Sequence, residues 1–288
     1  MSGSVEPPIV DSHVHIFTQD MPLARTAWTR PDYGFTAEDL IATLDTHGVR
    51  FAVIAGISLY GYYNDYMLEK LRKYPRLRGT ANVPPTIELA ELVEMKDAGV
   101  VGIRLFLSAQ LAGEIADLRS AEYQRLLRHV RELDWHVHFL ADESVFADAL
   151  DVLRASGVKV VIDHFSNPAP GEGPRCAKVA AALKAIDAGN TWMKISAGFR
   201  FSPRSPPRGG EDYARARRTE AEFDRYLLER VGPSRLLWGS DCPFVGHEGS
   251  VSYRDTLDAL EAAVPDPQIR RAISATALDF YFAEERAL

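Results

Sequence analysis

Two histidines separated by one residue stand out near the start of the chain, in the segment "PPIVDSHVHIF" of residues 7–17. His13 and His15 follow an apolar run typical of a β-strand, and Asp11 precedes them. Side chains i and i+2 of a strand point to the same side, so the two imidazoles share one face. Three roles fit this pair: ligation of a metal ion, catalysis without a metal, or an ordinary structural role.

Polar residues recur at the ends of other predicted strands. Arg104 lies late in one such segment, His164 follows Asp163 at the end of another, and Asp241 ends a third. Taken alone, each residue has an ordinary explanation, such as capping the loop or helix that follows. Because parallel strands of a barrel end at one common face, the joint pattern predicts a single catalytic site. Its expected members are His13, His15, His164 and Asp241.

The elements that must position these residues alternate between strand and helix patterns. The predicted strands are 9–16, 50–57, 78–83, 100–107, 135–141, 158–165, 191–197 and 236–241. The predicted helices are 36–47, 64–74, 86–98, 120–134, 143–156, 175–187, 219–231, 254–263 and 267–282. Strands alternating with helices indicate parallel βαβ units, and eight such units suit a closed (β/α)8 barrel, the TIM barrel.

An open, doubly wound sheet is the alternative, but no glycine-rich dinucleotide or phosphate motif follows a predicted strand. We therefore expect one α/β barrel domain over residues 1–288, with the final helix covering the barrel exterior or closing its base. Two long predicted loops, 17–35 and 198–218, follow strand ends, on the face where barrel enzymes hold their active sites.

Composition and charge exclude several classes of protein. The chain is 46% hydrophobic and 25% charged, which is typical of a soluble globular protein, and it has no apolar run long enough to span a membrane. A net charge of −7 disfavours nucleic acid and anionic membranes as partners. Only two cysteines and an N-terminus without signal-peptide features predict a cytoplasmic protein.

The motifs together resemble the amidohydrolase superfamily. The resemblance rests on D-x-H-x-H after the first strand, a histidine after the sixth and G-[ST]-D-x-P after the eighth, and it spans the whole chain. Within the superfamily, "DSHVHIF", "IDHFSNP" and "WGSDCPF" are similar to the branch that contains lactonases for 2-pyrone-4,6-dicarboxylate and for sugar acids. "RPDYGFT", "YGYYND" and "GVVGIRLF" support it.

The resemblance implies a site that could bind one Zn²⁺ through His13, His15, His164 and Asp241, since imidazole and carboxylate suit zinc. A binuclear site would want a bridging lysine, which neither the fourth nor the fifth predicted strand offers. We expect His138 to be an interior group rather than a ligand. Because lactonases of this branch can work without metal, we expect no required cofactor. Protonated imidazoles would then stabilise the oxyanion through charge-assisted hydrogen bonds.

The expected substrate is a small carboxylated lactone, with 2-pyrone-4,6-dicarboxylate as the leading candidate. Asp241 would activate water, while the histidines hold the scissile carbonyl. Guanidinium groups bind carboxylates in bidentate pairs, and tyrosines can orient a flat ring. The predicted binding residues are Arg30, Arg104, Arg200, Arg204, Tyr33 and Tyr63.

Alternatives are a sugar-acid lactonase, a zinc-dependent decarboxylase of the same fold, and a non-catalytic barrel that binds an acidic metabolite. A homodimer is an open expectation.

Overall fold

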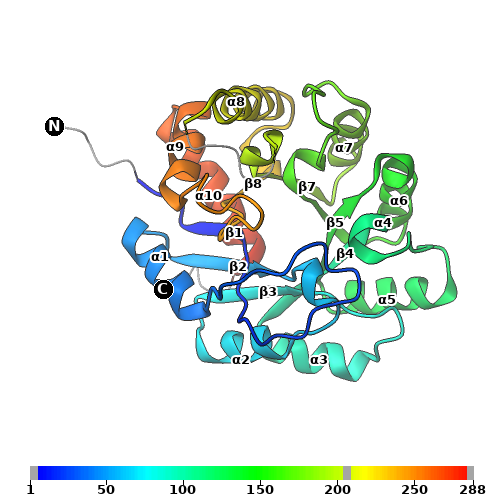
Figure 1. Cartoon of the computed structure of the whole chain (residues 1–288). Coiled ribbons are helices and arrows are strands. Elements are labelled where there is room, and N and C mark those ends of the chain that lie inside the picture. Colours follow the sequence, from blue (N-terminus) through cyan, green and yellow to red (C-terminus); the bar gives the residue numbers. More distant parts are fainter. Residues whose placement is uncertain (1–5, 204–208, 284–288) are drawn as a thin grey trace.

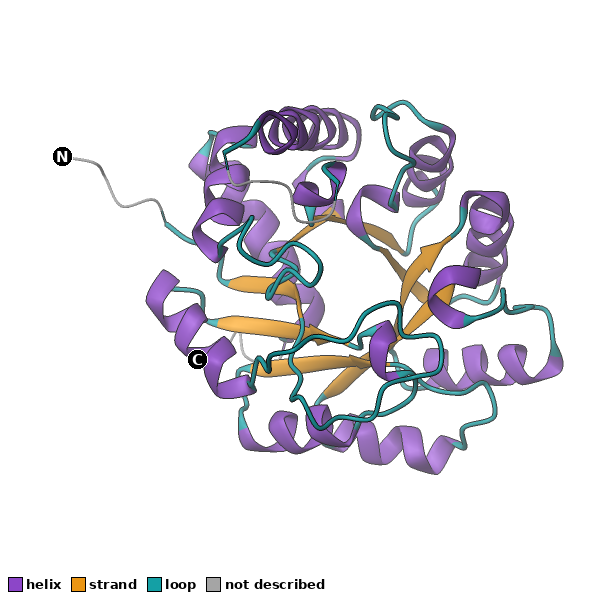
Figure 2. Ribbon diagram, viewed as in Figure 1, coloured by secondary structure: helices purple, strands orange, loops and turns teal. Residues whose placement is uncertain are grey.

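Eight parallel strands form the centre of the computed structural model, which describes residues 6–203 and 209–283 (Figures 1 and 2). The strands are hydrogen-bonded in the order β1 to β8. Their bounds are Val10–Val14, Phe51–Ala55, Leu77–Ala81, Val100–Leu107, His136–Ala141, Lys159–Ile162, Thr191–Ser196 and Leu236–Gly239. All eight coincide with predicted strands, so the predicted (β/α)8 barrel is confirmed.

The ring closes between the first and last strands. Val14 pairs with Cys242 in a parallel bridge, the Asp241 amide donates to the His13 carbonyl at 2.8 Å, and the His15 amide donates to the Cys242 carbonyl at 2.8 Å. The backbone that closes the barrel is therefore the backbone that carries the H-x-H pair and Asp241.

Helices surround the strands and bury their outward-facing apolar side chains (Figure 2). The helices are α1 (Ala37–His47), α2 (Asp65–Lys73), α3 (Leu89–Asp97), α4 (Ala109–Ala112), α5 (Ala121–Glu132), α6 (Glu143–Ala155), α7 (Ala177–Asp187), α8 (Glu211–Val231), α9 (Tyr253–Ala263) and α10 (Pro267–Tyr281). Four short 3-10 turns add to them, namely η1 (Ser58–Tyr60), η2 (His164–Ser166), η3 (Gly198–Phe201) and η4 (Pro233–Arg235). In the described part of the chain, no helix combines the length and apolarity that crossing a membrane requires.

The final helix, α10, closes the base of the barrel. Its Ala277 and Tyr281, with Phe282, form a buried cluster with the first residues of the strands, including Val10 and Leu237. Of the two positions predicted for the final helix, covering the barrel exterior or closing its base, the second is therefore the correct one.

One irregularity in β1 sets which side chains enter the barrel. The pairing of β1 with β2 shifts register between Asp11 and Val14. Asp11 then accepts a hydrogen bond from the Tyr253 hydroxyl of α9 at 2.9 Å, and also from the amides of His13 and Ser240. It thus joins β1 and β8 from the helical side of the barrel, while His13 points inward.

The predicted loop 198–218 is wrong in extent. Gly198–Phe201 forms η3, and α8 begins at Glu211 rather than at 219. The first two turns of α8 bury only Ala216, and their charged residues pair with one another, as Arg218 does with Glu211 at 2.6 Å. A helix stabilised by charge pairs shows little apolar periodicity, so the pattern did not reveal it.

Gly239 of β8 packs directly against β1. A Cβ at this position would lie 2.7 Å from the His13 Cβ and 2.9 Å from its amide nitrogen. Gly239→Ala should therefore displace His13 and lower the stability by about 1–3 kcal/mol. Gly173→Ala is the control, because a Cβ there meets nothing within 4 Å. Urea unfolding of both variants tests this, and equal stability would contradict the packing argument.

Candidate active site

Asp241 lies at the centre of the barrel mouth, with no exposed surface. Its Oδ1 is 3.2 Å from His15 Nε2, 3.5 Å from His13 Nε2 and 3.9 Å from His164 Nε2. The four residues predicted from three separate strand ends therefore converge on one carboxylate oxygen.

Left-handed backbone presents several of these side chains. Asp241 has φ 63°, and the residues from His164 to Asn167 all have positive φ, between 46° and 69°. Ala197, with φ 56°, precedes the η3 turn that carries Arg200. Such conformations cost about 1–3 kcal/mol each for residues other than glycine and cluster at functional sites. These sharp turns point the side chains into the barrel mouth. If the strands continued instead, the same side chains would lie beyond it.

Two of the imidazoles are oriented through their second nitrogen. His15 Nδ1 donates to the Ala55 carbonyl at 2.8 Å, and His164 Nδ1 lies 2.8 Å from the Ser196 hydroxyl. In both rings Nε2 is left facing Asp241. These hydrogen bonds fix the orientation of both rings, which is needed whether Nε2 binds a metal ion or contacts a substrate carbonyl.

Arg200 binds the other oxygen of Asp241. Its Nε and Nη2 donate to Oδ2 at 2.8 and 2.6 Å. Burial raises the pKa of Asp241, but Arg200, followed by His164 and His15, outweighs this effect and holds the pKa well below its usual range. Asp241 is therefore a carboxylate, and Arg200, predicted as a substrate ligand, contacts this carboxylate in the structure.

A second buried carboxylate, Asp163, lies deeper in the barrel. Arg104 donates to its Oδ2 from Nε and Nη2 at 3.1 and 2.8 Å, which supplies the partner that a guanidinium inside a strand must have. Its Oδ1 lies 3.0 Å from His138 Nε2 and 3.3 Å from His13 Nδ1. Burial raises the pKa of Asp163, yet His138, Arg104 and His13 together lower it well below its usual range.

Two further buried residues, Asp163 and Lys194, have no function predicted from the sequence. The Lys194 ammonium is fully buried, donates to the Ser12 carbonyl at 2.6 Å and lies 3.1 Å from His13 Nδ1. Burial lowers its pKa to about 7. Only the positions of Asp163 and Lys194 could have indicated a role in the site, because both lie at or near the carboxyl ends of strands, as the predicted residues do. His138 is an interior group beside Asp163, where we expected it.

The expectation of protonated imidazoles needs correction at two positions. Burial lowers the pKa of His164 to about 4 and that of His13 well below its usual range. Both rings are therefore neutral at pH 7 and act as neutral donors or as ligands.

The residues present fit a divalent metal ion. The ligand atoms of His13, His164 and Asp241 lie within 4.8 Å of one another, as do those of His13, His138 and Asp163. Ligand atoms of a tetrahedral zinc site are about 3.3 Å apart, close to the distances around Asp241 Oδ1. The hydrogen bond from His15 Nδ1 to the Ala55 carbonyl also matters here, because it places the proton of a neutral ring on Nδ1. The lone pair is then on Nε2, which faces Asp241 Oδ1, a carboxylate oxygen. A cation or a second ring proton relieves this contact.

A cavity of about 290 Å³ opens above Asp241. His15, His164, Arg104 and Arg200 line it with Asp241, whereas His13 lies beneath it with no exposed surface. Trp28, Asn167 and His247 are among the other residues that line it, and no sequence motif pointed to them.

Three other predicted substrate ligands, Tyr33, Tyr63 and Arg30, do not line this cavity. Tyr63 lines an adjoining cavity, and Arg30 is exposed on the loop after β1 and lines neither one. Tyr33 also lines neither cavity and donates to Glu248 at 3.0 Å. Arg204 lies outside the described residues.

The barrel, the convergent histidines and the aspartate after β8 define a hydrolase-type site, and comparison with known families agrees. The amidohydrolase family model matches residues 10–282, so the chain belongs to the amidohydrolase family.

Curated relatives and a solved structure narrow the comparison. The chain is 27% identical to 4-sulfomuconolactone hydrolase of Rhizobium radiobacter over 91% of this chain and 86% of that protein. It is 29% identical to 2-pyrone-4,6-dicarboxylate hydrolase of Comamonas testosteroni over 81% and 76%. A crystal structure of a probable 2-pyrone-4,6-dicarboxylic acid hydrolase from Acinetobacter baumannii, with citric acid bound, superposes with a TM-score of 0.85 at 28% identity, covering 95% of this chain and 99% of that one.

Asp163→Asn should destabilise the protein strongly, since it removes the charge that compensates Arg104 and Lys194 inside the barrel. Breaking a buried pair by removing one partner costs about 3–5 kcal/mol. Chemical denaturation measures the loss, with Asp148→Asn as the control, because Asp148 pairs with Arg119 at the surface. A loss below about 1 kcal/mol for Asp163→Asn would exclude this role.

Proposed function

We propose that this protein hydrolyses a lactone that carries one or more carboxylates, with 2-pyrone-4,6-dicarboxylate as the leading substrate. The observation that carries the proposal is one buried carboxylate, Asp241, that meets three imidazoles and an arginine at the wall of a small cavity. The lactone-hydrolase names of the relatives support the same reaction class.

In the proposed reaction, Asp241 takes a proton from water as the water oxygen adds to the lactone carbonyl carbon. His164, with Nδ1 accepting from the Ser196 hydroxyl, donates from Nε2 to the carbonyl oxygen as it becomes negative. His15 donates to the same oxygen from Nε2 when its ring holds a second proton, because its Nδ1 proton is used by the Ala55 carbonyl. The ring C–O bond then breaks, and the leaving oxygen recovers the proton from Asp241. Water is consumed, and the open-chain product carries one carboxylate more than the lactone.

His13 has a positioning role in this scheme. Its ring packs against those of His15 and His164, with centroids 5.0 and 4.5 Å away, and Lys194 contacts its Nδ1. With Nδ1 accepting from Lys194, the neutral ring carries its proton on Nε2, toward Asp241.

Arg104 and Arg200 are the proposed carboxylate ligands, since both reach the cavity. Arg200 is the more mobile candidate because its side chain is about one-third exposed, against 5% for Arg104. A substrate carboxylate that draws Arg200 away would leave Asp241 Oδ2 free to accept the proton of water.

Asp241→Asn should lower kcat for 2-pyrone-4,6-dicarboxylate by about 10³-fold or more, because the amide cannot take a proton from water. The fold should remain intact, since Arg200 can turn to solvent. Kinetics with a thermal melt of the same preparation test this. A rate near that of the wild type would rule out Asp241 as the base.

Arg200→Met should shift the pH dependence of the reaction. Arg200 lowers the pKa of Asp241, so its removal raises that pKa, and a higher pH is then needed to keep the base ionised. The acidic limb of the kcat/KM profile should move to higher pH, with Arg200→Lys showing a smaller shift. An unmoved limb in both variants would contradict the assignment.

His13, His164 and Asp241 would hold a zinc ion, which would polarise the lactone carbonyl when bound, whereas His15, predicted as a further ligand, lies outside this group of ligand atoms. A lactone is an activated ester, however, and we retain the prediction that hydrolysis does not require the metal. Activity should survive exhaustive dialysis against chelator, with metal content measured on the same sample. Full loss of activity that one equivalent of Zn²⁺ restores would refute this prediction.

The proposed setting is the cytoplasm, where the free thiols of Cys176 and Cys242 would stay reduced. A single domain over 1–288 and a homodimer stay predictions. The same assays distinguish the alternatives. A sugar-acid lactonase would turn over sugar lactones, a decarboxylase would release CO₂, and a non-catalytic binder would turn over no substrate.

A further inference from the structure

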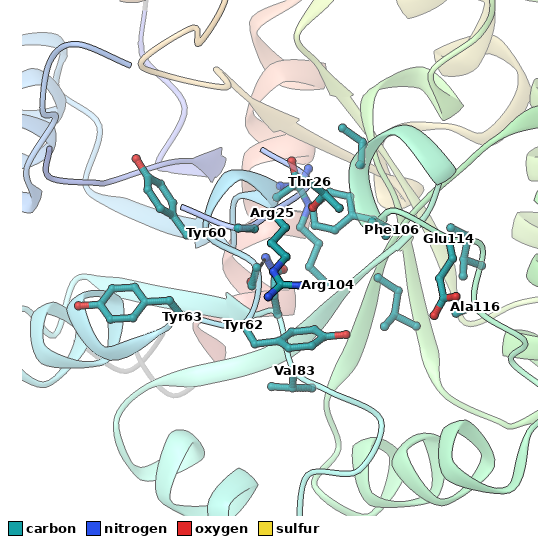
Figure 3. Close-up of a pocket in the computed structure, with 18 of the residues that line it drawn as sticks. Arg25, Thr26, Tyr60, Tyr62, Tyr63, Val83, Arg104, Phe106, Glu114 and Ala116 are labelled. Atoms are coloured by element: carbon teal, nitrogen blue, oxygen red, sulfur yellow. Dashed lines mark hydrogen bonds between the residues drawn. The ribbon is translucent and has the colours of Figure 1, made fainter. Parts of the chain in front are cut away.

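A second and larger cavity adjoins the catalytic one. Its volume is about 600 Å³, against about 290 Å³ above Asp241. It lies at the barrel rim beside β4, between the loop after β1, the loop after β2 and the segment that contains α4 (Figure 3). The loop after β1 is held to η1 by a hydrogen bond from the Ala24 amide to the Leu59 carbonyl at 2.8 Å.

The two cavities share a wall. Four residues line both of them, namely Ser58, Arg104, Phe106 and Leu111. The Arg104 guanidinium lies over the Phe106 ring, 4.6 Å from its centroid. A molecule whose carboxylate meets Arg104 in the catalytic cavity can therefore extend past Phe106 into the second one.

The walls of the second cavity are mostly aromatic and aliphatic. In Figure 3, Tyr60, Tyr62 and Tyr63 lie on one side and Phe106 on the other. Burial raises the pKa of Tyr60 and of Tyr123 to about 12, so these phenols are neutral. The remaining wall includes Leu23, Val83, Leu105, Leu107 and Ala116. Aromatic and aliphatic surfaces of this kind favour a flat apolar group.

The charges at the cavity wall balance. Arg25 and Glu114 are both exposed and of opposite sign, and neither has a hydrogen bond or ion pair within the described part of the chain. Their opposite charges offset each other, and Arg104, the third charged residue of the wall, is paired with Asp163. The wall as a whole therefore favours a neutral occupant over an ion, in contrast to the carboxylates expected beside Arg104 and Arg200.

We propose that the second cavity is a substrate subsite for a neutral, flat substituent, so that the natural substrate is a carboxylated lactone bearing an aryl or similar planar group. This inference rests on the proposed lactone hydrolysis and adds to it a substrate class larger than 2-pyrone-4,6-dicarboxylate. In this scheme Phe106, Tyr62 and Leu111 determine specificity and take no part in the bond changes.

The test compares 2-pyrone-6-carboxylate with a set of its phenyl derivatives. In the wild type, at least one phenyl derivative should have a kcat/KM about tenfold or more above that of the parent compound. Ala112→Trp, which fills the second cavity from an exposed position on α4, should remove that advantage and leave the parent within about twofold. Ala180→Trp, on the exposed face of α7 and away from both cavities, is the matched control and should change neither rate.

The outcomes separate the two proposals. No turnover by the wild type of 2-pyrone-4,6-dicarboxylate, of the parent compound or of any phenyl derivative refutes the proposed function. Turnover of the parent with no advantage for any phenyl derivative overturns the subsite alone, as does an equal effect of Ala112→Trp on both substrates. Should Ala112→Trp fail to fold by thermal melt, Tyr62→Ala replaces it, since this side chain is 59% exposed. If Tyr62→Ala keeps the full increase in kcat/KM for the phenyl derivative, the subsite is likewise overturned.

Discussion

Two fully buried carboxylates, Asp163 and Asp241, impose the constraint on which the barrel interior depends. An unpaired charge in such a place costs many kcal/mol, so the surrounding positions must supply cations and hydrogen-bond donors. Arg104 and His138 compensate Asp163 from β4 and β5, while Arg200 compensates Asp241 from η3 and His15 does so from just after β1. His13 lies between the two carboxylates and contacts both. The candidate catalytic residues thus form one continuous charge network rather than a set of independent groups.

The network divides the mouth into a rigid part and a variable part. Strand ends and left-handed turns hold the groups near Asp241, where backbone strain is compensated by dense pairing. The second cavity is built largely from the loops after β1, β2 and β4, which can change without disturbing the barrel. Such a division allows one hydrolytic centre to serve substrates of different size, which agrees with the low identity to relatives that share the fold.

Periodicity and strand-end position were sufficient to predict the eight strands, most of the helices and the convergence of His13, His15, His164 and Asp241. They could not predict what Arg200 contacts, because that depends on the turn that begins at Ala197, where an alanine adopts a conformation more typical of glycine. The role of Asp163 was equally hidden, since its partners come from other strands. The start of α8 was missed because charge pairs, which are not periodic, stabilise its first turns.

The helix α10 seals the base of the barrel, so in the described part of the chain the cavity above Asp241 is reached from the opposite end, at the mouth. Substrate and product must then pass over the same arginines, one entering and the other leaving. Hydrolysis of a lactone creates an additional carboxylate, so the departing molecule is the more negative of the two. If Arg104 and Arg200 bind the substrate carboxylates as proposed, they would bind the product more tightly than the lactone, and net turnover would depend on how quickly a following reaction removes the acid.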